Sequence, residues 1–427
     1  MKGALAVAAL VAASTSAHAE DAFTRAQTLH KEAIAAYKSG KLAEAASDFE
    51  KASALRPDQP SYKLSLATLD AKLGRKAEAI RFLNDYAALG LRADVQSDPD
   101  FASLENDPAF MAVVRRLAGN GKPVGAPEAV VTVSDGEALY EGIAFDKPTS
   151  RWFLGSVRDR KIVVVSADGK ASDFVPAGRD GVPGVFGLAM DAKHNRLYAA
   201  VSAVEQTQNL KTGELGSAGI FAFDPKTGAL VDKAIVSDGK KRVFGDLAVA
   251  PDGSVYLTDS LNPQIFRYTP STHELKEFVS SGKFHSLQGP VISTDGKRLI
   301  ASDYSVGIQV IDLGNKSVTT LQTPHNTTLL GIDGFVNAGS DSFIAVQNGT
   351  DPQRILRLTL DSGWHKIKSV QVLMANVEGK DEPSLGTVAG DYFYYFATSQ
   401  WDRFNDGGSV KKDAKFEPAL IARLKIR

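Results

Sequence analysis

GDLAVAPDGSVYLTDS, residues 245–260, is the stretch of the chain that decides its fold. It consists of two short runs of β-branched, aromatic and aliphatic residues, separated by Pro251-Asp252-Gly253. Such runs around a Pro-Asp-Gly turn predict a β-hairpin. The same pattern returns five more times, and successive copies begin 43 to 59 residues apart. The other copies begin at Glu141, Phe186, Gln288, Asp333 and Leu385.

A third strand follows most copies, as in KIVVVSADG (161–169) and GIQVIDLGN (307–315), and a fourth such as KEFVSS (276–281) comes after it. A four-stranded unit of about 40–50 residues, repeated six times, predicts a mainly β fold, a six-bladed β-propeller over residues 129–427. A sandwich or a parallel β-helix would not explain six copies that each pair a buried first strand with an Asp-Gly-type turn. AVVTVSD (129–135) is expected to close the ring as the outermost strand of the last blade.

The N-terminus has the pattern of a secretory signal. A basic Lys2 precedes an apolar run from Ala4 to Ala13, and Ala17-His18-Ala19 supplies an A-x-A cleavage site. Residues 1–19 are therefore predicted to be a bacterial-type signal peptide, with the mature protein periplasmic or secreted. An ordinary N-terminal helix is the alternative. No second stretch of about 20 apolar residues follows, so no transmembrane segment is expected in the mature chain.

Residues 20–119 have a helical pattern with a 34-residue self-similarity, in which Gly40 recurs as Gly74 and Ala45 as Ala79. Gly at a turn and small Ala at a close helix contact resemble the tetratricopeptide repeat, which implies a small all-α N-terminal domain. Asp98-Pro99 and Asp107-Pro108 are expected to start two further helices, with Asp as the N-cap. Residues 120–128 are rich in Gly and Pro and predict a linker.

Two roles for this tetratricopeptide-like domain remain open. Its concave face is a candidate surface for a protein partner. The same two repeats also fit a short helical cap that packs on the propeller, because stable arrays of such repeats usually contain three or more units.

The composition excludes several classes of protein. The chain has no cysteine, which excludes disulfide scaffolds, thiolate metal sites and cysteine nucleophiles. Lys and Arg number 49 and Asp and Glu number 50, and this balance argues against a nucleic-acid partner. No G-x-S-x-G, Walker A or G-x-G-x-x-G motif stands in a strand–turn–helix context, so serine hydrolases, P-loop NTPases and Rossmann enzymes are unsupported.

The first strands of the six blades are expected to line a central channel, and their starts open on one face. Glu141, Gln288 and Asp333 each begin such a strand. Two carboxylates and an amide carbonyl around one axis suit a divalent cation, Ca²⁺ or else Mg²⁺ or Mn²⁺. The alternative for these side chains is a solvated polar rim. A small-molecule ligand is expected at this channel mouth.

Further candidates for substrate binding lie just outside this ring. Asp303 and Asn348 end the second strands of two blades. Trp401 and Arg403 belong to a long insertion, residues 399–419, which is expected to form a lid or recognition surface over the mouth. A turn-supporting role for Asp303 and self-packing of the insertion are the alternatives.

The phrases EGIAFD (141–146) and QGPVISTDGKRLIASD (288–303) resemble the gluconolactonase/luciferin-regenerating family of lactone hydrolases, and NHL-repeat propellers are similar in pattern. The resemblance implies an exported metal-dependent lactone or ester hydrolase, with Glu141 and Asp333 as metal ligands and Asp333 as a catalytic residue. Gln288 falls where the family has a ligand Asn, and Gly245 falls where it has another Asn. A non-catalytic propeller that binds a ligand or a protein partner is therefore the alternative.

Overall fold

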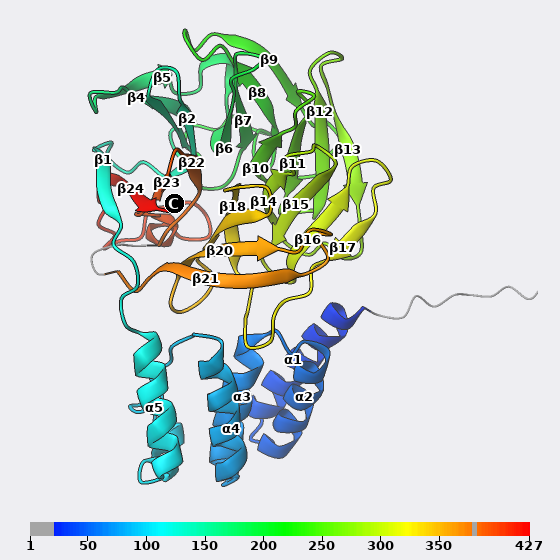
Figure 1. The fold of residues 1–427 in the computed structure, drawn as a ribbon, viewed down its shortest axis with the longest axis vertical. Coiled ribbons are helices and arrows are strands. Elements are labelled where there is room, and N and C mark those ends of the chain that lie inside the picture. The colour runs from blue at the N-terminus through cyan, green and yellow to red at the C-terminus, as the bar shows by residue number, and fades with distance from the viewer. Residues whose placement is uncertain (1–20, 378–381) are drawn as a thin grey trace, which may run out of the picture.

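The computed structural model describes residues 21–377 and 382–427, and the expected signal sequence lies outside these residues. The chain forms a helical layer and a six-bladed β-propeller, which lie one above the other in Figure 1. Each blade is a four-stranded antiparallel sheet, and each inner strand contacts that of the next blade around the whole ring. The mainly β, six-bladed prediction is confirmed.

The strands of the first three blades are, from the inside outward, β2 (Tyr140–Asp146), β3 (Arg151–Ser156), β4 (Lys161–Val165) and β5 (Ala171–Val175); β6 (Gly184–Asp191), β7 (Arg196–Ser202), β8 (Ala218–Phe223) and β9 (Leu230–Ile235); β10 (Phe244–Val249), β11 (Val255–Asp259), β12 (Gln264–Thr269) and β13 (Glu274–Ser280). The next two are β14 (Leu287–Ile292), β15 (Arg298–Asp303), β16 (Gly307–Asp312) and β17 (Val318–Thr320); β18 (Ile332–Asn337), β19 (Ser342–Gln347), β20 (Arg354–Leu360) and β21 (Ile367–Ala375).

The sixth blade joins the two ends of the propeller. It contains β22 (Gly386–Ala389), β23 (Tyr392–Phe396), β24 (Ala419–Lys425) and, outermost, β1 (Glu128–Val133). β1 pairs with β24 in antiparallel register, so the predicted closure of the ring is confirmed. Closure packs the inner strand of the last blade against that of the first, so the inner edge strands are protected within the ring.

Five inner strands share an irregular start, which sets the geometry of the channel mouth. The register of β2, β6, β10, β14 and β18 against its neighbour shifts within the first few residues. A β-bulge of this kind re-aims the side chains beside it. The bulges lie where Glu141, Gln288 and Asp333 stand, at the end of the channel on which the predicted site residues converge.

The helical layer contains α1 (Ala22–Lys38), α2 (Leu42–Leu55), α3 (Pro60–Lys72), α4 (Lys76–Ala88), the short 3₁₀ helix η1 (Pro99–Leu104) and α5 (Pro108–Asn120). α1 packs on α2 and α3 on α4, with Ala45 and Ala79 fully buried at the contacts. The Asp98 and Asp107 side chains accept hydrogen bonds from the first turns of η1 and α5, as expected of N-caps. Among the described helices, none is long and apolar enough to cross a membrane.

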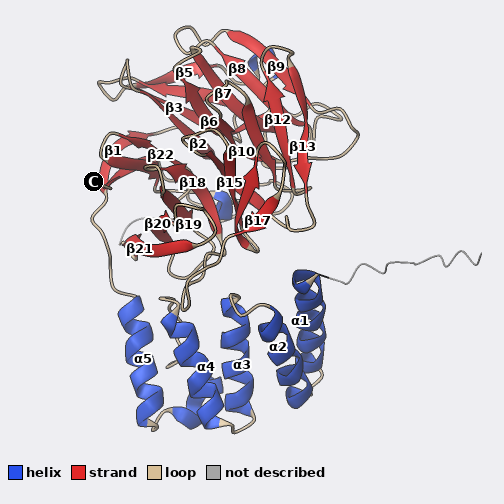
Figure 2. Ribbon diagram, turned by 45° about the vertical axis from the view of Figure 1, so that its right-hand side comes forward, coloured by secondary structure: helices blue, strands red, loops and turns tan. Residues whose placement is uncertain are grey.

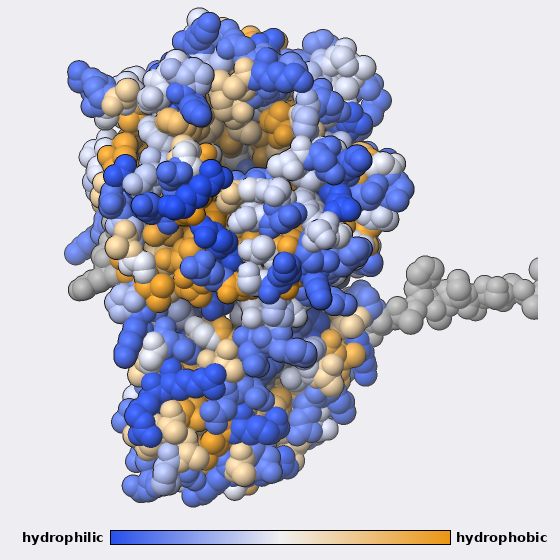
Figure 3. All heavy atoms as spheres, viewed as in Figure 1, coloured by the Kyte–Doolittle hydropathy of each residue, from blue (hydrophilic) through white to orange (hydrophobic). Residues whose placement is uncertain are grey.

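The helical layer docks on the channel-mouth face of the propeller, at blades four and five (Figure 2). The Arg354 guanidinium donates to the carbonyl of Leu89 (3.0 Å), and that of Arg56 donates to the carbonyl of Ser305 (2.8 Å). The ring of Phe23 stacks on His285 at a centroid distance of 3.9 Å. In Figure 3, hydrophobic residues gather over β20 and β21, beside this boundary. The layer is therefore in position to influence access to the channel mouth.

The predicted linker is held against the propeller. Val124 forms an antiparallel bridge with Ala375 at the end of β21, through hydrogen bonds of 2.9 and 3.1 Å. The amide of Asn376 donates to the carbonyls of Asn120 and Lys122. Residues 120–128 thus connect the helices to β1, and a single β-bridge attaches them to the outer edge of blade five.

Candidate functional site

A cavity of about 240 Å³ lies at the channel mouth. The predicted metal ligands Glu141, Gln288 and Asp333 all line it, as do the predicted substrate contacts Asn348 and Trp401. The full lining consists of Glu141, Phe186, Val243, Gly245, Asp246, Ser260, Gln288, Tyr304, Asp333, Asn348, Glu382, Leu385 and Trp401. Six blades therefore contribute to one concave site, as the repeat of strand starts predicts.

Glu141 is 6% exposed and is held by two hydrogen bonds. The Ser384 hydroxyl donates to its Oε1 (2.8 Å) and the Trp401 indole donates to its Oε2 (2.7 Å). Burial and the nearby charge of Asp333 nevertheless raise the pKa of Glu141, because both disfavour its ionised form.

Asp333 stands in a short chain of polar groups. The Asn348 amide donates to its Oδ2 (3.0 Å), and the Tyr304 hydroxyl donates to the Asn348 carbonyl oxygen (3.3 Å). Burial raises the pKa of Asp333, although the hydrogen bond from Asn348 opposes this rise. This chain fixes the orientation of the carboxylate toward the cavity.

Asp246 is a third acidic residue in the lining of the cavity, and Glu382 is the fourth. Asp246 stands on the bulge of β10 where the other copies have glycine, and its Oδ1 accepts from the backbone N–H of Leu247 (2.8 Å). A Cβ on Gly187 would lie 2.4 Å from this oxygen, so only glycine leaves room for the carboxylate. Burial and the charge of Asp333 raise the pKa of Asp246 to about 7, against a backbone hydrogen bond that lowers it.

The donor types of this cavity fit a hard cation. Four carboxylates line a small volume, and the charge of Asp333 raises the pKa of Glu141 and of Asp246. None of the described lining residues is Lys, Arg or His. The Gln288 carbonyl oxygen lies next to Gly245, at 3.7 Å from where a Cβ would stand. In the described part of the chain no three His, Asp or Glu side chains form a group that would hold one ion. Any cation here would therefore take at most two carboxylates and complete its shell with amide oxygens and water.

Two predicted substrate contacts do not line the cavity. Asp303 is completely buried, and its carboxylate accepts from the backbone N–H groups of His285, Ser286, Ser305 and Val306. This arrangement supports the turn after β15, which is the structural alternative for Asp303. The Arg403 guanidinium donates to the carbonyl of Lys415 and pairs with Asp402. Substrate binding by these two residues stays a prediction without support from their positions.

The two long insertions meet above the mouth. Gly408 of the sixth blade lies against the backbone of Glu205 in the insertion 203–217 of the second blade. Arg158 joins them, because it lies over the ring of Phe404 (4.8 Å) and donates to the carbonyl of Gln206 (3.4 Å). Trp401 is held between Phe186 and Glu141 by this packing. The insertions thus form a fixed wall of the site.

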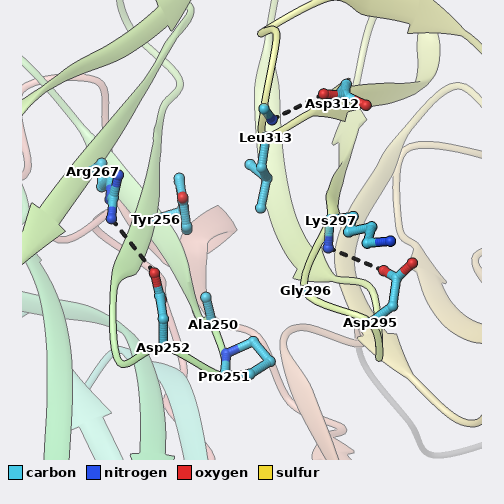
Figure 4. A pocket seen from close by; sticks show the side chains of 11 residues that line it. Ala250, Pro251, Asp252, Tyr256, Arg267, Asp295, Gly296, Lys297, Asp312 and Leu313 are labelled. Atoms are coloured by element: carbon cyan, nitrogen blue, oxygen red, sulfur yellow. Dashed lines mark hydrogen bonds and ion pairs between the residues drawn. The ribbon is translucent and has the colours of Figure 1, made fainter.

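A larger cavity of about 500 Å³ lies on the opposite face, between the Asp-Gly turns of blades three and four (Figure 4). Its acidic groups already have partners: Asp252 pairs with Arg267 (3.5 Å), and Asp295 accepts from the backbone of Lys297 (3.0 Å). At the channel mouth, Glu141, Asp246 and Asp333 accept hydrogen bonds from neutral donors and have raised pKa values, so this is the better candidate site.

Sequence reasoning missed Asp246 and Tyr304. An Asp at the position where the aligned copies have glycine was a usable signal for Asp246. Tyr304 directly follows Asp303 at the end of a second strand, and this place beside the channel mouth was a usable signal for Tyr304.

No protein-family model matches the chain, and no curated protein matches it significantly. Solved structures resemble its fold. One, provisionally named a gluconolactonase, is 15% identical with a TM-score of 0.48, covering 71% of this chain and 98% of that one. The PQQ-bound form of an aldose sugar dehydrogenase from Streptomyces coelicolor is 16% identical with a TM-score of 0.46, covering 70% and 98%. A gluconolactonase from Xanthomonas campestris is 14% identical with a TM-score of 0.45, covering 71% and 99%. The likeness to all three is one of fold.

Proposed function

We propose that this protein hydrolyses a lactone or a related ester at the channel mouth, with a divalent cation held by Glu141, Gln288 and Asp333. The observation that carries the proposal is that these three predicted ligands line one small, acid-rich cavity. The resemblance of EGIAFD and its repeats to a family of lactone hydrolases points to the same chemistry. When bound, the cation would polarise the carbonyl group and lower the pKa of a bound water.

The residues of the chain have separate tasks in this proposal. Asp333, oriented by Asn348, accepts a proton from the water as the water oxygen bonds to the carbonyl carbon. The ring C–O bond then breaks, and the leaving oxygen takes this proton to give a hydroxy acid. Asn348 and Trp401 border the substrate. The Trp401 indole and the Ser384 hydroxyl hold Glu141 in place, which keeps its carboxylate directed at the same cavity.

A ligand-binding propeller without catalysis is the second candidate. Gly245 brings no side chain to the position where the lactonase pattern has an Asn, and both oxygens of Glu141 already accept hydrogen bonds. In that case the acidic cavity would organise a binding site and perform no reaction.

Metal analysis of the purified protein, followed by a lactonase assay with Ca²⁺, Mg²⁺ or Mn²⁺ added, tests the proposal. Asp333→Ala and Glu141→Gln should lose both bound metal and hydrolysis while remaining folded. Asp295→Ala, an exposed acid on the opposite face, is the control and should retain both. Activity that survives both site variants would reject the mechanism. Bound metal without turnover would favour the binding protein.

The proposal includes export. N-terminal sequencing of protein recovered from a periplasmic extract should begin at Glu20, and intact Met1 on cytoplasmic material would contradict export.

A further inference from the structure

A second cavity, of about 380 Å³, lies where the helical layer meets the propeller. α1 contributes Phe23, Gln27 and His30 to it, and the start of α3 contributes Ser61 and Tyr62. Its opposite wall comes from the channel-mouth loops of blades four and five, with Tyr304, Ser305, Leu330, Gly331 and Gly349. We call it the interdomain cavity. Its volume is within the range of about 300–1,000 Å³ that is usual for small-molecule sites.

Tyr304 joins this cavity to the candidate site, because its side chain lines both. Its hydroxyl bonds Asn348 in the acidic cavity. Burial, together with the charges of Asp333 and Glu382, raises the pKa of Tyr304 to about 12, because each of them disfavours the phenolate. A ligand in the acidic cavity therefore lies one side chain away from the interdomain cavity.

The lining of the interdomain cavity is polar with aromatic side chains, and Arg56 is the one Arg or Lys among its described residues. Phe23, Tyr62 and Tyr304 supply the rings, and Gln27, Gln59 and Ser61 supply amide and hydroxyl groups. Leu330 is the one aliphatic side chain longer than alanine among its described lining residues, so the cavity does not suit an acyl chain.

Charged ligand groups are also poorly matched. The described lining includes no carboxylate to receive a cation. Its Arg56 is buried and already bonded to both oxygens of Asp58 (2.8 and 2.7 Å) and to the carbonyl of Ser305. Burial lowers the pKa of His30, which favours its neutral form, and its Nδ1 has no hydrogen-bond partner among the described residues. A neutral group with many hydroxyls and one apolar face fits this lining, and a pyranose ring is such a group.

We propose that the interdomain cavity binds a second sugar unit of the substrate, so that the protein acts on the lactone of an oligosaccharide acid. The lactone ring occupies the acidic cavity, and the attached sugar passes Tyr304 and stacks between the helices and the blade loops. This inference rests on the proposed hydrolysis for the identity of the reacting ring. The helical layer then serves as a specificity element built into the site.

Cavity-filling variants test the proposal. Ser61→Trp places a large ring in the interdomain cavity. The matched control is Ser53→Trp, in a different cavity of about 490 Å³ at the same boundary, whose lining does not include Tyr304. The probes are gluconate and cellobionate, the hydrolysed acids, each added with Ca²⁺ so that the cation offsets the repulsion between their carboxylate and the acidic cavity. Calorimetry then measures their binding without any need for turnover. Equal melting temperatures of the variants show that they are folded.

The native protein should bind cellobionate at least about tenfold more tightly than gluconate. Ser61→Trp should abolish this preference and leave gluconate binding unchanged, while Ser53→Trp should keep it. Equal affinity for the two acids in the native protein, or a preference that survives Ser61→Trp, overturns the proposal. A preference with these variant effects but no hydrolysis of either lactone would reject the proposed reaction and leave the sugar site standing.

Discussion

The indole Nε1 of Trp401 donates a hydrogen bond of 2.7 Å to Oε2 of Glu141. The bond ties the insertion of the sixth blade to the first strand of the first blade, across the closure of the ring. The bond orients the carboxylate and at the same time competes with the proposed cation for one of its two oxygens. The position of the insertion 399–419 and the orientation of Glu141, a proposed cation ligand, therefore depend on the same hydrogen bond.

Replacing Trp401 by Phe should make this coupling measurable. The variant keeps most of the ring packing but leaves one oxygen of the buried Glu141 side chain without its donor, so the metal-free protein should lose about 1–3 kcal/mol of unfolding free energy. The freed oxygen should then increase the stabilisation gained on adding Ca²⁺. Denaturant unfolding with and without the ion measures both effects.

Trp364 provides the control, because its Nε1 donates to Asp341 (2.9 Å) at a site that does not line the cavity. Trp364→Phe should lower stability without changing the response to Ca²⁺. An equal response to the ion in both variants would contradict the coupling.

The raised pKa of Asp246 predicts an unusual dependence of stability on pH. Its pKa is about 7 in the folded protein, against about 3.9 for an Asp in an unfolded chain. Between these values the folded state binds more protons than the unfolded state, so the contribution of Asp246 to stability falls as pH rises from about 4 to 7.

Asp246→Asn should therefore raise the melting temperature of the metal-free protein near pH 8 and have little effect near pH 4. Thermal unfolding in the presence of a chelator measures this difference. A stabilisation of equal size at both pH values would show that the charge of Asp246 is not the cause.

The fold could be predicted because its information is local and repeated. The hairpin of residues 245–260 returns at a spacing that only a closed ring of blades explains, and the period also places Glu141 and Asp333 on one face. The position of a residue in the repeat did not, however, predict whether its side chain points into the cavity. The bulge on β10 adds one residue, and this brings the side chain of Asp246 into the cavity, where Gly245 alone was considered.

The docking of the helical layer could not be predicted from the sequence. It depends on pairs far apart in the chain, such as Arg354 with Leu89 and Arg92 with Asp351, which follow no periodic pattern. The different surroundings of two Asp residues could also be recognised only from the structure. Asp333 faces a cavity, while Asp303 is enclosed by backbone N–H groups, although both flank the same mouth.

Alanine substitution should distinguish the roles of these two acids. Asp303→Ala leaves several buried N–H groups without an acceptor, so it should cost at least about 3 kcal/mol of unfolding free energy. Asp333→Ala removes a charge from a crowded acidic cavity and should leave the metal-free protein as stable as the native one or more so. Urea unfolding of both variants measures the difference. Comparable losses would mean that Asp333 is also a structural residue.

The attachment of the linker to blade five gives the last prediction. Gly125 has a φ of +78°, and a Cβ there would lie 2.3 Å from the carbonyl oxygen of Leu373. Gly136 also has a positive φ, +57°, but no atom within 4 Å of its would-be Cβ.

Alanine at either position should cost about 1–2 kcal/mol of unfolding free energy through its backbone conformation, and at Gly125 it must also displace the backbone of β21 at Leu373. Gly125→Ala should therefore expose residues 120–128 to protease while Gly136→Ala does not. The bridge between Val124 and Ala375 attaches the end of the helical layer to blade five, so the Gly125 variant should also lose the preference for cellobionate. Equal resistance to protease in both variants would show that docking does not depend on this bridge.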